Sequence, residues 1–129
     1  MPVCSDSRGF TLIEFLVAIV ITMVGLLALL QSVNIALNHN LQNQLRNEAV
    51  ALADQQMARE LAKGFENVST SNKNTNESRQ IVNGFKNFSV VRTGLQYQNS
   101  KEVRYNVNWD YKGVRYTHDT AGIISRSNQ

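Results

Sequence analysis

Glu14 is the only charged residue in an apolar stretch that runs from Phe10 to Leu30. A carboxylate in a membrane-length apolar helix costs on the order of a few kcal/mol even on lenient insertion scales, so it calls for a cationic partner. Cleavage of the peptide bond after Gly9 would create one, because Phe10 would then carry a new α-amino group that is largely protonated at neutral pH. That group lies too near the start of its own helix to meet Glu14 easily, whereas a staggered neighbouring copy could offer it. These residues therefore indicate a processing step followed by assembly.

The apolar stretch itself has the length of a membrane span. Its roughly twenty residues would form a helix of about 30 Å, the thickness of the hydrocarbon core of a bilayer. Arg8 precedes the stretch and the next basic residue is Arg46, which predicts a cytoplasmic N-terminus and an exported C-terminus. A secretory signal would have a shorter apolar region followed by small residues at its cleavage site. An uncleaved anchor would need neither the carboxylate nor the Gly9-Phe10 junction.

The residues from Gly9 to Glu14 read Gly-Phe-Thr-Leu-Ile-Glu, behind a short polar leader and ahead of the apolar run. This motif resembles the class III signal peptide of type IV pilins and type II secretion pseudopilins. The resemblance implies that a membrane-embedded prepilin peptidase cuts after Gly9 and that Phe10 becomes the mature, N-methylated terminus. It also implies that Glu14, the fifth mature residue, pairs with the neighbouring N-terminus in a filament.

The same resemblance implies partners and a location. The partners are prepilin peptidase, other pilin or minor pilin subunits, the inner-membrane pilus assembly machinery and the lipid bilayer. Before assembly the chain would cross the inner membrane of a Gram-negative bacterium once, with its N-terminus in the cytoplasm and its C-terminal domain in the periplasm. After assembly it would lie in a pilus at the cell surface.

Gln31 stands where many major pilins have an early helix proline. In this respect the chain is more similar to PilV-type minor pilins, which take part in pilus assembly or initiation, than to a major subunit. Residues 46–53 resemble the same group. A minor pseudopilin of a type II secretion system, with the same N-terminus, remains an alternative.

Residue patterns divide the chain into five expected segments. They are a cleaved leader at 1–9, a transmembrane or filament-core helix at 10–30, an amphipathic helix at 31–65 that continues into the globular domain, a solvated loop at 66–80, and an antiparallel sheet region at 81–129. Apolar residues recur every three to five positions through the second helical segment, and Gly64 is its expected C-terminal cap. Polar Asn, Ser and Thr residues dominate 66–80, which predicts a loop without a core.

The sheet region contains one strongly alternating segment, from Glu102 to Lys112, in which Val103, Tyr105, Val107, Trp109 and Tyr111 share one face. Lys112-Gly113 predicts a turn, followed by a partner strand at 114–120, and further strands are expected at 86–93 and near Leu95. The aromatic face could be an adhesive platform, but it is more typical of a sheet that packs on a helix. The expected fold is α+β and type IV pilin-like, a long N-terminal helix, transmembrane in its first half, packed on a small antiparallel sheet.

Composition and spacing argue against an enzyme or a metalloprotein. The single cysteine, Cys4, lies in the leader, so the mature chain is expected to have neither a disulfide nor a thiolate metal site. His39 and His118 are far apart and have no metal-binding spacing, and we expect no cofactor.

Nucleic acid is a weakly indicated partner. The net charge of +3 is mild and its basic residues are scattered, whereas nucleic-acid surfaces usually cluster them. A third possible function is nevertheless a pilin-like module that binds DNA for uptake through Arg104, Lys112 and Arg115.

Overall fold

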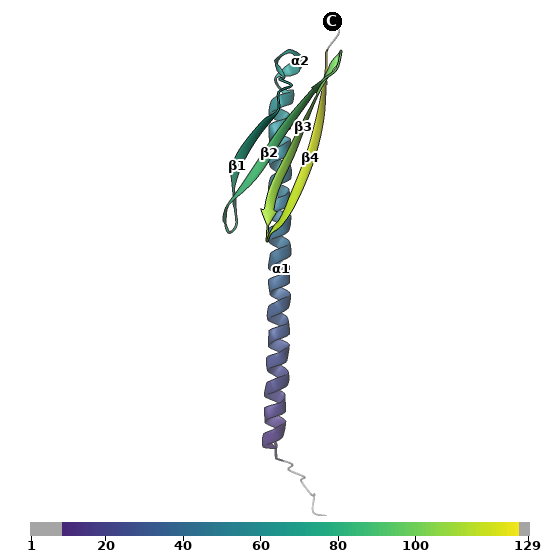
Figure 1. The fold of residues 1–129 in the computed structure, drawn as a ribbon. Helices are drawn as coiled ribbons and strands as arrows, with labels where there is room; N and C mark the ends of the chain where they lie inside the picture. Colours follow the sequence, from purple (N-terminus) through teal and green to yellow (C-terminus); the bar gives the residue numbers. More distant parts are fainter. Residues whose placement is uncertain (1–8, 127–129) are drawn as a thin grey trace, which may run out of the picture. The chain divides into compact units, whose positions relative to one another are not determined.

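The computed structural model describes residues 9–126. These residues form two helices and four strands, shown in Figure 1: α1 (Leu12–Leu61), α2 (Gly64–Asn67), β1 (Lys73–Ile81), β2 (Gly84–Gln96), β3 (Ser100–Tyr111) and β4 (Val114–Ser125). The chain divides into two compact units, Met1–His39 and Asn40–Gln129, with the boundary inside α1. Of the predicted leader, only Gly9 belongs to the described residues, so Arg8 and Cys4 lie outside them.

Helix α1 is unbroken over 50 residues, because no proline occurs in it and Gly25 is its only glycine. It ends at Leu61, four residues before the predicted end at 65. Gly64 adopts a left-handed backbone with φ +73°, a conformation that glycine reaches without steric cost. Gly64 therefore marks the break in the chain that was predicted there: α1 ends three residues before it, and the short helix α2 begins at it.

The four strands form one antiparallel sheet in the order β1-β2-β3-β4, a meander in which each strand pairs with the next (Figure 1). Lys112 and Gly113 connect β3 to β4 and both have positive φ values, 50° and 78°. Positive φ at both central residues is what a type I′ hairpin turn requires, and this turn matches the right-handed twist of the flanking strands. The turn predicted at Lys112-Gly113 is therefore confirmed.

The core lies between the second unit's part of α1 and the inner face of the sheet. Its buried apolar side chains are Leu45, Ala49, Leu52, Ala53 and Met57 from the helix, Val68 from the connection, and Phe88, Val90, Val103, Tyr105, Val107 and Trp109 from the sheet. Ala49 and Ala53 are both 0% exposed, so this face of the helix is fully covered. Trp109 is 3% exposed and packs against Phe88 with ring centroids 6.1 Å apart. The aromatic row is thus a packing face, and the expected α+β, type IV pilin-like fold is confirmed.

Two of the strand expectations need correction. Residues 66–80 were expected to form a loop, but Lys73–Ile81 is strand β1, paired with β2 along its whole length. An edge strand needs only backbone pairing on one side, so its polar side chains do not prevent it from forming. Asn83-Gly84 just after β1 is a hairpin signal that predicts this pairing. The pieces expected at 86–93 and near Leu95 are parts of one strand, β2.

Candidate functional site

The processing motif forms the start of helix α1. The backbone N–H of Glu14 donates to the Thr11 hydroxyl oxygen at 3.3 Å, so Thr11 is the N-terminal cap. Glu14 follows three residues later, the spacing of a capping box, and its charge lies in the first turn, where the helix dipole favours an acid. Part of the motif therefore has a local structural function, which is to begin the helix directly after the predicted cleavage junction.

Gly9 and Phe10 precede the helix, in no regular secondary structure, and both are exposed. A Cβ atom added to Gly9 would meet no described atom within 4 Å, and its φ is not in the left-handed region. The fold described here thus places no requirement for glycine at position 9. A requirement for glycine there must come from a molecule that binds the junction. Cleavage at this bond and methylation of Phe10 stay predictions.

Glu14 is exposed, and within residues 9–126 its carboxylate has no ion-pair or hydrogen-bond partner. The hydroxyl groups further along the same apolar helix are satisfied locally, since Thr22 Oγ1 donates to the Ala18 carbonyl at 2.7 Å and Ser32 Oγ to the Ala28 carbonyl at 3.1 Å. Unlike these hydroxyl groups, the Glu14 carboxylate therefore needs a partner from outside the described residues. Its predicted pairing with a neighbouring Phe10 remains a prediction.

Most of the described part of the first unit is an apolar helix. Its best 18-residue window has a mean hydropathy of 2.7 and no buried residue, so by length and composition this helix can cross a membrane. Large apolar side chains such as Leu12, Ile21 and Leu30 are 66% to 80% exposed. In water such a surface must be covered. The helix and the motif together fit a membrane-anchored pilin.

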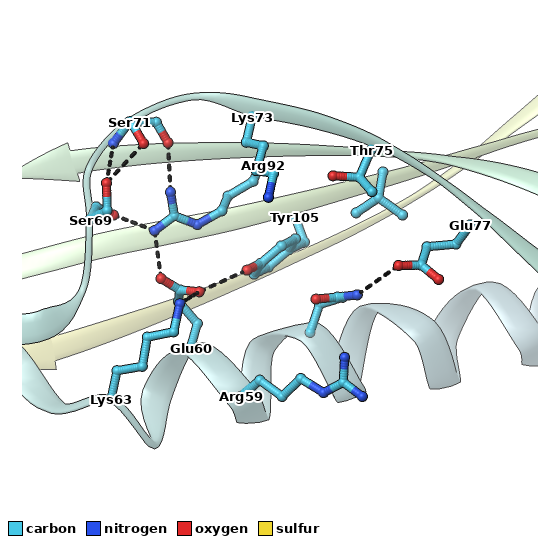
Figure 2. A pocket seen from close by; sticks show the side chains of 12 residues that line it. Arg59, Glu60, Lys63, Ser69, Ser71, Lys73, Thr75, Glu77, Arg92 and Tyr105 are labelled. Atoms are coloured by element: carbon cyan, nitrogen blue, oxygen red, sulfur yellow. Dashed lines mark hydrogen bonds and ion pairs between the residues drawn. The ribbon is translucent and has the colours of Figure 1, made fainter.

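The second unit contains a cavity of about 350 Å³ (Figure 2). It lies between the last turns of α1 and the inner face of β1, β2 and β3. Its lining residues are Gln56, Arg59, Glu60, Lys63, Ser69, Ser71, Lys73, Thr75, Glu77, Val90, Arg92 and Tyr105. The cavity is thus lined mainly by polar and charged side chains.

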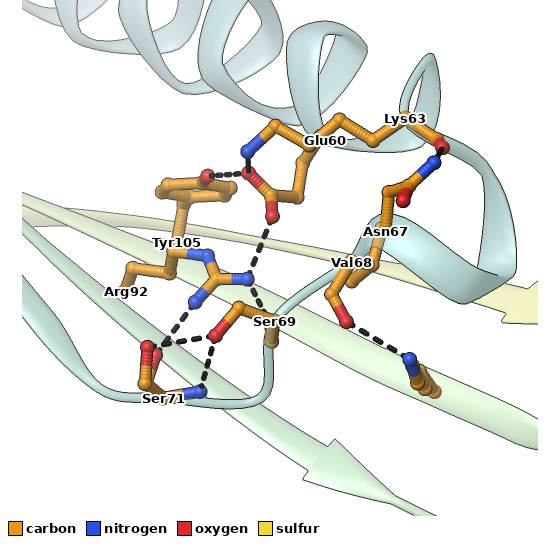
Figure 3. A network of polar contacts seen from close by, with 9 residues as sticks. Glu60, Lys63, Asn67, Val68, Ser69, Ser71, Arg92 and Tyr105 are labelled. Carbon is orange, nitrogen blue, oxygen red and sulfur yellow. Dashed lines mark hydrogen bonds and ion pairs between the residues drawn. The ribbon is translucent and has the colours of Figure 1, made fainter.

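Buried charges at one end of this cavity tie the helix to the sheet (Figure 3). Arg92 on β2 donates through Nη2 to Glu60 Oε1 at 2.7 Å, and the two side chains are 8% and 6% exposed. Glu60 Oε2 accepts from Lys63 Nζ at 2.9 Å and from the Tyr105 hydroxyl at 3.2 Å. We call Glu60, Lys63, Arg92 and Tyr105 the Glu60 cluster. One carboxylate therefore serves two cations and a phenol.

The Glu60 cluster also fixes the connection between helix and sheet. Arg92 donates to the carbonyl of Ser71 at 2.6 Å and to that of Ser69. Earlier in the same connection, the carbonyls of Phe65 and Val68 accept from the Lys101 ammonium at 2.7 and 3.0 Å. Two cations of the sheet thus satisfy carbonyls that the short helix α2 and the following loop leave free.

Two groups of the cluster have shifted pKa values. Burial of the Glu60 carboxyl opposes its ionisation, but the hydrogen bond from Lys63 and the charge of Arg92 outweigh this effect, so the pKa of Glu60 lies below its ordinary value. Burial raises the pKa of Tyr105, and the neighbouring Glu60 charge raises it further. The cluster is therefore an ionised carboxylate and a neutral phenol at neutral pH. Sequence reasoning missed it, since Glu60 and Arg92 are far apart in the chain and match no motif.

The cations considered for DNA binding are engaged within the chain. Arg104 pairs with Glu102, and Arg115 pairs with Asp110 through two bonds of 3.0 and 3.3 Å. The Lys112 ammonium lies 5.7 Å from the centre of the Tyr111 ring. Balanced pairs of this kind release few counterions on binding phosphates, so this face of the sheet does not favour the DNA-uptake function.

The histidines do not form a site in the described part of the chain. His39 is exposed on α1, and His118 is partly buried on β4. Across residues 9–126, the structure contains no group of three His, Cys, Asp or Glu side chains placed to hold a metal ion.

Comparison with known families supports the reading of the N-terminus. Residues 4–30 match the family model described as the prokaryotic N-terminal methylation motif. Comparison with curated proteins and with solved structures gave no match. The matched segment contains Gly9, Phe10 and Glu14 and ends where the apolar run ends. Together with the fold, this match supports a prepilin-type protein of the type IV pilin kind, in which processing by prepilin peptidase and association with the membrane and with pilus subunits are implied.

Proposed function

We propose that this chain is a minor type IV pilin, most similar to the PilV type, that takes part in pilus assembly or initiation. Prepilin peptidase cleaves it between Gly9 and Phe10 and methylates Phe10. The observation that carries the proposal is the motif from Gly9 to Glu14, which lies inside the matched segment 4–30 and directly begins an exposed apolar helix. Gln31, in place of an early helix proline, supports the minor subtype.

The assembly step moves the apolar helix from lipid into a bundle of like helices. Lipid tails are as apolar as leucine side chains, so this transfer gains little from the hydrophobic effect and depends on side-chain packing and polar contacts. Glu14 supplies the polar contact, because its carboxylate is costly in hydrocarbon and gains a cation from the Phe10 α-amino group of a neighbouring subunit. Cleavage creates that cation, so an unprocessed chain cannot offer it.

The chain occupies the inner membrane before processing and the pilus after it. The uncleaved chain crosses the inner membrane once, with its N-terminus in the cytoplasm and the residues after the span in the periplasm, where the sheet folds on α1. The processed chain then enters the pilus through the inner-membrane assembly machinery.

Intact-mass and N-terminal analysis of the protein recovered from membranes of its native host tests the processing step. A chain that begins at methylated Phe10 is the expected result. A chain that begins at Met1 in a host with active prepilin peptidase would refute the proposal and leave an anchored domain of another function.

A minor pseudopilin of type II secretion shares this N-terminus and is the second candidate. Deletion of the gene separates the two functions, because loss of twitching motility with normal secretion follows from a pilus subunit. Loss of secretion with normal twitching would assign the chain to the secretion filament instead.

A further inference from the structure

We infer that the cavity between α1 and β1 binds a compact oxyanion, the phosphate or carboxylate group of a small ligand. Its volume of about 350 Å³ lies at the lower end of the range of ligand pockets, which suits a small molecule. Serine and threonine hydroxyls and four cationic side chains face it (Figure 2). The distribution of charge around it carries the inference.

Two cations oppose each other on the strand side of the cavity. Lys73 of β1 and Arg92 of β2 are register partners, and both line the cavity. Like charges directly opposite each other on one face of an antiparallel pair are destabilising. Within this structure Lys73 has no carboxylate partner among the described residues. An anion between the two side chains would turn this repulsion into attraction.

The carboxylates that line the cavity do not neutralise its cations. Glu60 already serves both Arg92 and Lys63, and Glu77 accepts from the Gln56 amide at 3.4 Å. Arg59 and Lys73 lack an ion-pair partner in the described part of the chain, so four cations face two carboxylates. The cavity therefore has an excess of positive charge in a partly enclosed site, where charge interactions are stronger than in water.

A hydrogen-bond donor is available in addition to the charge. The Arg92 side chain is 8% exposed, and its Nε is buried with no acceptor among the residues that the structure describes, although its two Nη atoms are engaged. Because Glu60, Ser69 and Ser71 hold the Nη atoms, the guanidinium is already oriented. A buried donor without an acceptor is costly, and an oxyanion in the cavity would supply one. Lys73 and Arg59 on opposite walls would supply further charge-assisted bonds.

Phosphate titration of the full chain in neutral detergent micelles tests the inference. Amide chemical shifts are followed by ¹⁵N NMR in Tris buffer while phosphate replaces chloride at constant ionic strength. We expect saturable shifts confined to residues 69–75 and the neighbourhood of Arg92, with a Kd on the order of 1 mM. Lys73→Gln should weaken binding about tenfold, because one charge-assisted bond is lost. Shifts that rise linearly without saturation, or that spread over all basic residues, would overturn the site.

Lys86→Gln is the matched control, since Lys86 lies on the neighbouring strand β2 and outside the cavity. It should leave the Kd unchanged within about twofold, and equal weakening by both lysine variants would reduce the effect to net charge and refute the inference. Arg59→Gln, at an exposed helix position, replaces Lys73→Gln if that variant does not fold. A parallel titration with acetate shows which oxyanion the cavity prefers. If acetate binds more tightly than phosphate, the ligand carries a carboxylate group; if phosphate binds more tightly than acetate, the ligand carries a phosphate group. Binding of neither anion refutes the site.

Discussion

Replacement of Glu60 by Gln should strongly destabilise the second unit. The carboxylate is 6% exposed and is the only counter-charge that the described residues offer to Arg92, whose side chain is 8% exposed. Removal of one partner from a buried ion pair costs about 3–5 kcal/mol, because an uncompensated charge stays buried. At about 4–8 °C per kcal/mol for a domain of this size, the Tm should fall by at least about 12 °C. The near-UV circular dichroism of Trp109, measured on the full chain in neutral detergent during heating, reports this loss.

Glu77→Gln provides the matched control. Glu77 also lines the cavity, but it is partly exposed and its partner is the uncharged Gln56. The same acid-to-amide change there should cost less than about 0.5 kcal/mol. A Tm of Glu60→Gln within about 3 °C of the parent chain, or equal to that of Glu77→Gln, would show that the Glu60 cluster does not hold the helix to the sheet.

The pH dependence of stability follows from the same carboxylate. The pKa of Glu60 in the fold lies below its ordinary value of 4.5, so the folded state binds the proton less tightly than the unfolded chain. Its stabilising contribution is therefore fully present above about pH 5 and is lost as the pH falls through the lowered pKa. Thermal unfolding between pH 3 and 7 should show this acid-induced loss in the parent chain. The acid-induced loss should be smaller in Glu60→Gln, and identical profiles would contradict the assignment.

Three further predictions concern the glycines and the N-terminus. Gly94→Ala should destabilise the chain by about 3 kcal/mol, because the new Cβ would lie 2.6 Å from the Thr70 backbone. Gly122→Ala should cost only about 1 kcal/mol, because its new Cβ would meet the flexible Met57 side chain. Equal decreases in Tm for the two variants would contradict this difference. Glu14→Ala should leave cleavage intact and weaken assembly, and a normal number of pili in that variant would count against charge pairing. Gly9→Val should block cleavage by crowding the peptidase site, so a product of mature length on an immunoblot would exclude this requirement.

Local patterns were sufficient for most of the fold. Strict alternation from Val103 to Tyr111 predicts which face of β3 is buried, because successive side chains of a strand point to opposite faces. Lys112-Gly113 predicts the β3–β4 turn through the positive φ that it requires. Each of these features depends on neighbours in the sequence, so the sequence alone carries the signal.

Most of the missed features form only when the strands pair with one another and pack on the helix. Strand β1 has no apolar face and forms because β2 offers it a ladder of backbone partners, so its side chains could not reveal it. Arg92 lies on the same face of β2 as Phe88 and Val90, but the sequence does not show that Glu60 and the carbonyls of the connection come to lie beside it. Arg104 and Arg115 were predicted to be available for DNA because their ion pairs form only in the folded sheet. Arg104 pairs with Glu102 on the same face of β3, and Arg115 of β4 pairs with Asp110 of β3.

The two units of the chain differ in how their apolar side chains are covered. The second unit buries its apolar side chains against one another and satisfies its buried carboxylate, so it is stabilised by its own contacts. In the first unit, no residue of the most apolar 18-residue window is buried, and either lipid or like helices can cover this surface about equally well. The shape and hydrophobicity of this helix therefore do not determine whether it lies in the membrane or in a filament. Under the proposed charge pairing, Glu14 would discriminate between them, because lipid tails offer its carboxylate no partner, whereas the α-amino group of a processed neighbour would offer a cation. If the proposed cleavage and pairing occur, the charge created by cleavage would make assembly favourable only for mature subunits.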